Sequence, residues 1–283
     1  MEMLSIKDIL KKVDELPALS HVTFKVLKLT NNPKTSVTDL ADTITQDQVL
    51  TIKVLRMANS AYYGYTRKIF SINEAVIILG FSAVRNLVLA ASVNKVMTKE
   101  FDGYYLSKGE LWKHSMATAI IARALAKKVE PNLSDQAFMA GLLHDIGKII
   151  LDTYMKNLFQ QVIEKVNTEH IPFMDAERLI IGFDHAEVGS QIGEKWNLPE
   201  ELVESIAKHH NPSEAKINPK LTGLIHVADA LSMSMGMGLG GDGMYYPFDG
   251  GVSAKLNLTE DVLEETLAEL ADSLINSDAM LED

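Results

Sequence analysis

The stretch from Phe138 to Leu151 holds the residues of this chain that are best suited to chemistry. It is mostly apolar, but His144, Asp145 and Lys148 interrupt it. The four-residue spacing of His144 and Lys148 puts them on one side of a helix, with Asp145 about 100° further round. Because a buried polar group is costly without a partner, these side chains need one. On its own the stretch fits either a hydrogen-bonded core histidine with a capping aspartate or a reactive pair.

The other histidines narrow this choice. Seven of the eight lie between residues 114 and 226, in the second half of the chain. Candidate ligands recur along it in a fixed order: His114, His144-Asp145, His185, His209-His210 and Asp229. This order resembles that of the HD superfamily of metal-dependent phosphohydrolases. Ordinary core histidines rarely reproduce so many matched positions.

The resemblance implies a site for two divalent transition metal ions. It would place one ion on His114, His144, Asp145 and Asp229 and the other on His185, His209 and His210, with Asp145 bridging both. The two oxygens of one carboxylate can hold two cations about 3.5–4 Å apart, which suits hydrolysis of a phosphate ester. Imidazole and carboxylate ligands accept Fe, Mn, Ni, Co or Zn, so they do not identify the metal.

Lys148 and Asp145 are the candidate catalytic residues. Lys148 could meet the charge that develops on a phosphoryl group, or it could be a solvated or snorkelling lysine. One of His209 and His210 could instead pair with the end of its helix, which attracts His. Asp229 could orient a ligand from outside the coordination sphere. We expect His226 to be such a neighbour, and His21 and His170 to be surface or packing residues.

Glu110 has two explanations. It lies four residues before His114, where some HD-GYP relatives place an additional glutamate ligand. It could also form a capping box with Ser107, which is the explanation we favour because it needs no metal. A third ion is therefore not part of the prediction.

The first half of the chain resembles the HDOD family of bacterial signalling domains. The similarity rests on Leu16–Leu19, on Asp47–Gly64 and on Ser71–Gly80, and it spans roughly residues 10 to 210. It implies an α-helical signalling domain. HDOD domains commonly have a degraded His-Asp site, whereas this sequence keeps the matched positions. No Gly-Tyr-Pro follows His209-His210, so specificity for cyclic di-GMP is not implied.

The apolar spacing predicts an all-α, multi-helix bundle. We expect an N-terminal helical part over residues 1–105, an HD-like part over 106–253 and an acidic helix within 254–283. One helix is expected from Ser134 to about Tyr154 and a second over Leu158–Thr168, with a polar connection over 101–109. Expected N-caps are Ser36, Ser71, Ser134, Asp184 and Thr259, and expected C-caps are Asn59 and Gly80. The glycine-rich segment 232–251 should be a mobile loop beside the metal pocket.

Composition limits the partners. The chain has 47% hydrophobic residues, no Cys and a net charge of −11. Residues 254–283 contain nine acidic residues and one lysine, so only −3 remains for the rest. Without a basic stripe we expect no nucleic-acid polymer as partner, and without a long apolar run no membrane. A phosphate-containing small molecule or nucleotide, a signalling protein partner and a cytoplasmic location are the expectations.

Three functions remain open from the sequence. The first is a metal-dependent phosphohydrolase or phosphodiesterase, which needs an open coordination position. The second is a non-catalytic signalling or partner-binding module whose metal centre is structural or redox-sensing. The third is a di-iron oxygenase, because a few HD proteins with a similar ligand set perform oxidation.

Overall fold

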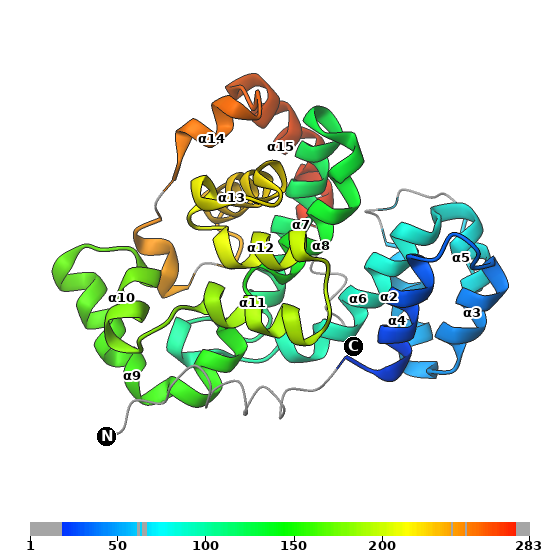
Figure 1. Ribbon diagram of the computed structural model, residues 1–283, viewed down its shortest axis with the longest axis horizontal. Helices are drawn as coiled ribbons and strands as arrows, with labels where there is room; N and C mark the ends of the chain where they lie inside the picture. The colour runs from blue at the N-terminus through cyan, green and yellow to red at the C-terminus, as the bar shows by residue number, and fades with distance from the viewer. Residues whose placement is uncertain (1–18, 61–62, 64–66, 239, 247, 276–283) are drawn as a thin grey trace. The chain divides into compact units, whose positions relative to one another are not determined.

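A computed structural model describes residues 19–60, 63, 67–238, 240–246 and 248–275, and within these ranges it consists of helices joined by turns and short connections (Figure 1). The described residues contain no strand, only one isolated antiparallel bridge between Phe101 and Leu106. The predicted all-α class is confirmed. Contacts divide the chain into two units, one built around residues 17–96 and the other around residues 97–270.

The unit around residues 17–96 consists of short helices with well-defined ends. They are α2 (His21–Thr30), α3 (Val37–Thr45), α4 (Gln48–Ala58), α5 (Ile72–Leu79) and α6 (Phe81–Met97). Ser36 and Asp39 form a complete capping box at α3, and Ser71 accepts from Glu74 N at α5. Gly80 ends α5 with φ of 86°, a value that glycine adopts without steric cost. These predicted caps, and Asn59 as the C-cap of α4, are confirmed.

The unit around residues 97–270 carries every candidate ligand. Its helices are α7 (Glu110–Val129), α8 (Ser134–Leu143), α9 (Lys148–Glu169), α10 (Phe173–Ile180), α11 (His185–Lys195), α12 (Glu200–Lys208), α13 (Pro219–Ser234), α14 (Gly250–Lys255) and α15 (Glu260–Ile275). Short 3₁₀ turns lie at Asp102–Tyr104 (η2), Pro131–Leu133 (η3), Pro212–Glu214 (η4) and Gly241–Met244 (η5). Helix α7 packs against α8 and α13, and α11 against α12 (Figure 1).

The contact between α7 and α8 is unusually close. A Cβ atom on Gly141 would lie 2.8 Å from Ala119 Cα, so only glycine lets the two backbones approach this far. Most of α7 is buried, including Trp112 and Met116, because it lies between α8 and α13. This packing fixes the face of α7 that carries His114.

The expected continuous helix from Ser134 to Tyr154 is wrong. Helix α8 ends at Leu143, a turn covers residues 144–147, and α9 begins at Lys148. Hydrogen bonds of the 3₁₀ type, from an N–H to the carbonyl three residues earlier, replace the α-helical ones here. Ile146 N donates to Leu143 O, and Lys148 N donates to Asp145 O. Helix α9 then continues without a break to Glu169, so the separate helix expected over Leu158–Thr168 is also wrong.

Two other local predictions are wrong. Helix α7 has Gly109 as its N-cap, with φ of 88° and no side-chain cap bond, so Ser107 and Glu110 do not form a capping box. Ser134 is the first residue of α8, and its hydroxyl donates to Pro131 O. By contrast, Asp184 accepts from Glu187 N, and Thr259 Oγ1 accepts from Val262 N, so these two N-caps are confirmed.

Residues 101–106 are not the polar connection that their composition suggested. Phe101 and Leu106 pair through their backbones, and both side chains are buried together with Tyr104. Gly103 N donates to Asp152 Oδ1 at 2.7 Å, which ties the turn to α9. The turn therefore places a tyrosine in the interior of the unit.

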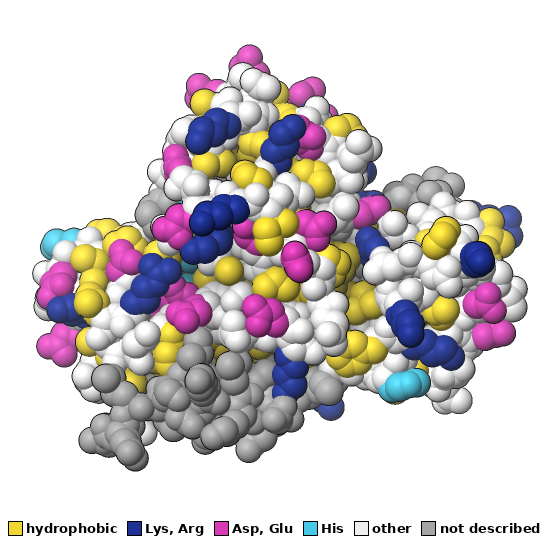
Figure 2. All heavy atoms as spheres, viewed as in Figure 1, with side chains coloured by type: hydrophobic (Ala, Val, Ile, Leu, Met, Phe, Trp, Pro, Cys, Tyr) yellow, Lys and Arg dark blue, Asp and Glu magenta, His cyan; other side chains and the backbone are white. Residues whose placement is uncertain are grey.

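The surface of the unit mixes both charges. In the face seen in Figure 2, Lys and Arg side chains are interspersed with Asp and Glu over its helices. Lys128 on α7 pairs with Glu265 and Glu269 on α15, so the acidic helix docks on α7. None of the helices within the described residues is both long and apolar enough to cross a bilayer.

Candidate metal centre

All seven predicted ligands lie close together inside the unit around residues 97–270. They form three overlapping groups, and within each group the donor atoms all lie within 4.8 Å of one another. The groups are His114, His144 and Asp229; His144, Asp145 and His209; and His185, His209 and His210. Asp145 thus stands between the other two groups. The fold thus gathers the side chains that the resemblance named, and their role as metal ligands stays a prediction.

Asp145 turns one oxygen to each side of the site. Its Oδ2 lies 3.3 Å from His144 Nε2 and 3.6 Å from His114 Nε2. Its Oδ1 lies 3.5 Å from His185 Nε2 and 3.9 Å from His209 Nε2. A carboxylate placed in this way can bridge two cations.

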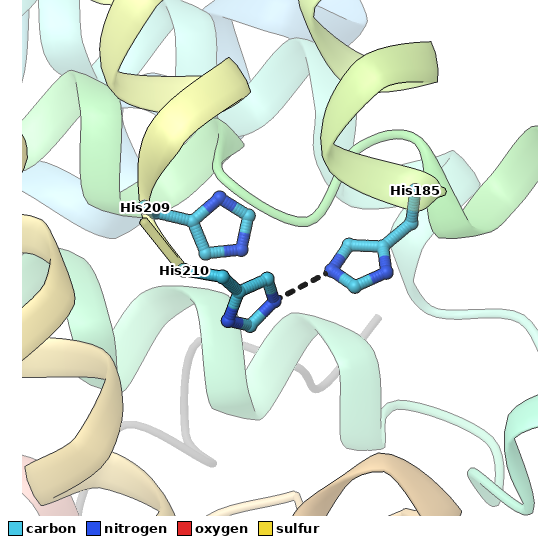
Figure 3. Close-up of side chains that lie close together, drawn as sticks. All are labelled: His185, His209 and His210. Atoms are coloured by element: carbon cyan, nitrogen blue, oxygen red, sulfur yellow. Dashed lines mark hydrogen bonds between the residues drawn. The ribbon is translucent and has the colours of Figure 1, made fainter. Parts of the chain in front are cut away.

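The ligands come from five separate segments. His114 lies on α7, His144 and Asp145 in the turn after α8, and Asp229 on α13. His185 opens α11, while His209 and His210 follow the end of α12, and Figure 3 shows these three rings facing one another. His185 Nε2 and His210 Nε2 are 2.9 Å apart. Because few of the ligands are neighbours in sequence, tertiary packing must assemble the site.

Gly147 brings α11 against the turn. A Cβ atom there would lie 1.9 Å from His185 O and 2.6 Å from Gly189 N, so the glycine is required for this approach. Space at Gly189 is also limited, since a Cβ atom added there would lie 2.9 Å from the Ile206 side chain. The turn that ends α8 and the start of α11 therefore meet backbone to backbone, which sets the separation of Asp145 and His185.

Hydrogen bonds at Nδ1 orient the histidine rings. His144 Nδ1 lies 2.7 Å from Gly141 O, and His209 Nδ1 lies 2.8 Å from Ile206 O. His114 Nδ1 lies 3.1 Å from Met237 O. A carbonyl can only accept, so in each neutral ring Nδ1 carries the proton and Nε2 offers its lone pair. Metal-binding histidines commonly show this pattern.

Several atoms that point into the site are buried without a hydrogen-bond partner among the described residues. They are Nε2 of His114, His144 and His209, and Oδ1 of Asp145 and Asp229. His114 Nε2 approaches Asp229 Oδ1 to 2.9 Å, but without hydrogen-bond geometry. Buried polar atoms are normally satisfied, so a cluster of such atoms needs an explanation. Divalent transition ions fit this set of nitrogen and oxygen donors.

The electrostatics of the site are those of close, buried, opposite charges. Burial disfavours the charged form of His144, but Asp145 and Asp229 outweigh burial and raise its pKa to about 10. Burial, together with the charges of His144 and His185, lowers the pKa of His209 to about 3. The pKa of Asp145 lies well below its usual value, because His144 and Lys148 overcome the opposing effect of burial.

Lys148 is neither solvated nor snorkelling. Its side chain is 2% exposed, and Nζ lies 2.5 Å from Asp145 Oδ2. The ammonium also lies 5.5 Å from the centre of the Tyr104 ring, a distance at which a cation is attracted to the ring face. A buried positive charge next to the bridging carboxylate can interact with an anionic group in the site.

The other three histidines and Glu110 lie outside the three groups of candidate ligands found among the described residues. His226 lies outside the three groups, since Nδ1 faces His209 O at 2.8 Å and Nε2 accepts from Asp249 N at 2.9 Å. His226 thus contacts the backbone of a candidate ligand, and its assignment as a residue that does not bind metal stays a prediction. His21 and His170 are exposed, as expected. Among the described residues, none of the three groups includes Glu110.

The segment after α13 borders the site, as predicted for the glycine-rich region, but residues 232–234 belong to α13 and residues 250–251 to α14, so the irregular part is shorter than expected. We call its described residues 235–238, 240–246, 248 and 249 the cover segment. Gly238, with φ of 64°, lies against α7, where an added Cβ would meet Glu110 O at 2.3 Å. Tyr246 OH donates to Asp229 Oδ2 at 2.8 Å. A cavity of about 10 Å³ remains beside His185 and His210, lined also by Phe173 and Tyr245.

Sequence reasoning missed three side chains that touch the candidate ligands: Tyr246, Glu177 and Tyr104. Glu177 contacts His185 Nδ1 at 2.7 Å, and Tyr104 OH donates to Glu177. Glu177 lies close to Asp175 and Arg178, and a glutamate among charged residues is ordinarily expected at the surface. The pair Tyr245-Tyr246 in a glycine-rich segment was the one available signal, since an aromatic pair in such a segment needs a surface to pack on.

Comparison with known proteins agrees with the fold and the resemblance. The HDOD domain family model matches residues 16–212. A crystal structure of an HDOD domain protein of unknown function from Geobacter sulfurreducens superposes with a TM-score of 0.77 and 27% identity, covering 98% of this chain and 96% of that one. A provisionally named phosphohydrolase from Shewanella amazonensis SB2B superposes with a TM-score of 0.76 and 26% identity, covering 97% and 98%.

The chain also resembles, over a shorter stretch, a protein named as a ribonuclease. Ribonuclease Y of Aster yellows witches'-broom phytoplasma is 30% identical over 120 residues, which are 42% of this chain and 17% of that protein. The chain spans less than half the length of the first curated relatives that it matches, 38% of one and 49% of the other.

Proposed function

The chain belongs to the HDOD family, and we propose that it holds two divalent transition metal ions and hydrolyses a phosphate ester. His114, His144 and Asp229 would hold one ion, and His185, His209 and His210 the other. Asp145 would bridge them. The observation that carries this proposal is that the two oxygens of Asp145 face different sets of imidazole nitrogens, of which Nε2 of His114, His144 and His209 lack a hydrogen-bond partner among the described residues.

Two bound divalent cations polarise a phosphoryl oxygen and activate water near neutral pH. The residues of the chain have separate tasks in such a site. The Nδ1 bonds of His114, His144 and His209 keep these rings in the orientation that presents Nε2. Lys148 lies next to Asp145 and would stabilise negative charge on the phosphoryl group in the transition state. Tyr246, bonded to Asp229, belongs to the segment that would exclude bulk water.

The names of similar proteins support the reaction class. The Shewanella amazonensis structure bears the provisional name phosphohydrolase, and Ribonuclease Y is named as a nuclease, which cleaves a phosphodiester. A phosphate-containing small molecule or a nucleotide is the substrate that we propose, because the surface of the unit mixes both charges and lacks a basic stripe in the view of Figure 2.

A second candidate is a non-catalytic signalling module that holds the same ions. It is favoured by the burial of the site, since His144, Asp145 and His209 are at most 1% exposed and the adjacent cavity is only about 10 Å³. A closed set of protein ligands suits a structural ion, whereas a catalytic ion needs an open position. The two candidates differ in whether the cover segment opens to admit a substrate.

One experiment separates these functions. Wild type, Asp145→Asn and Lys148→Met are reconstituted with Mn or Fe, and metal content, melting temperature and hydrolysis of a generic phosphodiester and a nucleotide panel are measured. Lys148 is fully buried, so Met keeps the volume that Ala would leave empty. For an enzyme, Lys148→Met should keep both ions and lose turnover by about 10²–10³-fold, as for other charge-stabilising donors.

Asp145→Asn should lose metal in either case, because it removes the bridging charge while keeping the size of the side chain. For a signalling module, metal-loaded wild type hydrolyses nothing in the panel, and Lys148→Met binds both ions like wild type. Fewer than half an equivalent of transition metal in reconstituted wild type would reject the metal centre itself. Turnover that survives unchanged in Asp145→Asn would place the active site elsewhere.

A further inference from the structure

A buried carboxylate outside the ligand set holds one of the candidate ligands at two points. Glu177 on α10 is fully buried. Its Oε2 lies 2.7 Å from His185 Nδ1 and accepts from His185 N at 3.1 Å. The same oxygen therefore fixes both the ring and the backbone of the residue that opens α11. A carboxylate buried this deeply is costly unless its partners satisfy it.

Tyr104 supplies the partner for the other oxygen of Glu177. Its hydroxyl donates to Glu177 Oε1, and its ring meets that of His185 edge-on, with centroids 6.3 Å apart. Tyr104 also lies near Lys148, whose ammonium is 5.5 Å from the centre of the Tyr104 ring. Tyr104 thus contacts the partner of one candidate ligand and the lysine that pairs with Asp145.

The turn at residues 101–106 leaves Tyr104 little freedom. Gly103 N is bonded to Asp152 Oδ1, and an added Cβ on Gly103 would meet the Phe159 ring at 2.5 Å. The Tyr104 ring packs against Phe159 and Phe173, at centroid distances of 4.7 and 5.4 Å. A tyrosine held in this way keeps its hydroxyl in one place, so the hydrogen bond to Glu177 is preorganised.

His185 differs in this respect from the other histidines with an Nδ1 partner. His144, His209 and His114 each face a neutral backbone carbonyl, whereas His185 faces a carboxylate. A charged acceptor forms a hydrogen bond roughly twice as strong as a neutral one. It also raises the basicity of the imidazole at the nitrogen that binds a metal.

We propose that Tyr104 and Glu177 are positioning residues that hold His185 with Nε2 toward the site and strengthen it as a ligand. The ion on His185, His209 and His210 is therefore the more tightly bound of the two. This inference rests on the proposed metal centre. It adds that the two ions are bound with unequal affinity, and that Tyr104 and Glu177, which lie outside the coordination sphere, cause the difference.

The test compares metal binding by full-length wild type, Glu177→Gln, Tyr104→Phe and Asp152→Asn. Gln can still accept from His185 with its amide oxygen, so Glu177→Gln removes the charge while keeping the shape. Asp152→Asn is the matched control, because Asp152 anchors the same turn through Gly103 but none of its hydrogen bonds reaches a candidate ligand. Each protein is stripped of metal and titrated with Co or Zn against a competing chelator. The absorption bands of bound Co and the melting temperature of the metal-free protein are also recorded.

Wild type should bind two ions with distinct affinities. Glu177→Gln should weaken the tighter ion by about 10–100-fold, the range found for partners of metal ligands, and leave the other unchanged. Tyr104→Phe should weaken the same ion by less and shift the same Co bands. Asp152→Asn should alter neither affinity.

Three results would overturn the inference, and they are distinguishable. Two ions in wild type with unchanged affinities in Glu177→Gln would reject the role of Glu177 and leave the metal centre standing. Equal weakening of both ions, with a matching fall in the melting temperature of the metal-free protein, would mean that the pair only supports the fold. Failure of wild type to bind any ion would reject the proposed function and this inference with it.

Discussion

Replacing Gly147 with alanine should destabilise the protein, although intrinsic helix propensity alone predicts the opposite. Gly147 has φ of −66° and ψ of −26°, which alanine adopts easily, and alanine is favoured over glycine in helical backbone by about 1 kcal/mol. However, the new Cβ would lie 1.9 Å from His185 O, whereas ordinary contact begins at 3.4 Å. The turn and α11 would have to separate by about 1.5 Å, the difference between these distances.

No side-chain movement can relieve this clash, because the atoms that the new Cβ would meet, His185 O and Gly189 N, both belong to the backbone of α11. Overpacking typically costs 1–3 kcal/mol, and a clash between two backbones belongs at the upper end, so we expect a loss of about 3 kcal/mol. For a unit of this size 1 kcal/mol shifts the melting temperature by about 2–4 °C, which gives a decrease of roughly 6–12 °C. Displacing His185 would also impair the site that it shares with His209 and His210.

Urea unfolding and thermal melting of the metal-free protein measure this change without any contribution from a bound ion. Gly250→Ala serves as the matched control, because Gly250 is the first residue of α14 and has nothing within 4 Å of an added Cβ. It should be neutral or slightly stabilising. If Gly147→Ala were as stable as wild type, the close approach of the turn and α11 would not exist as described.

Two further predictions concern stability away from the site. Glu204 accepts backbone N–H groups from Lys216, Ile217 and Asn218, which lower its pKa despite some burial. Its folded pKa lies below the unfolded value, so its contribution is present at neutral pH and is lost as the pH falls below about 4.3 and through the folded pKa. Glu204→Gln should therefore cost about 1 kcal/mol at pH 7, discounted for exposure, and urea titrations should show the difference vanishing in acid; a difference independent of pH would contradict the charge argument. Ser36→Ala removes the cap of α3 and should cost about 1 kcal/mol in the unit around residues 17–96. Ser36→Thr should restore most of this stability, because its hydroxyl can both accept from Asp39 N and donate to Asp39 Oδ2. Equal stability of all three proteins by urea unfolding would refute the capping role.

The order of His and Asp residues was enough to predict which side chains gather. Residues such as His185 and His209 lie on different helices, yet the family resemblance places them together without knowledge of the packing. Helix ends with local signals were also predictable. Ser36 caps α3 through Asp39, three residues away, so the whole interaction lies within the sequence window that was read.

Features that depend on tertiary contact were not predictable. The apolar residues of 138–151 keep a helical spacing on both sides of His144 and Asp145, and the break at 144–147 coincides with the contact between Gly147 and the start of α11. The polar composition of residues 101–109 concealed Tyr104, whose burial follows from its packing on α9 and α10. At Glu110, a glycine with positive φ supplied the helix start that was assigned to Ser107, because both signals are compatible with the same sequence.

The burial of the candidate ligands has a consequence for how the proposed metal centre would exchange its ions. The donor atoms come from five segments that meet only in the folded state, and the cover segment closes over them through Met237 and Tyr246. An ion in such a site can leave only when the structure opens, so its exchange would follow the opening rate and not the ordinary lability of its ligands. The ion captured during folding would then exchange slowly, and the metal content of a fresh preparation would reflect the ions available while the chain was being synthesised. Two batches with identical sequence and fold could thus differ in composition according to the growth medium.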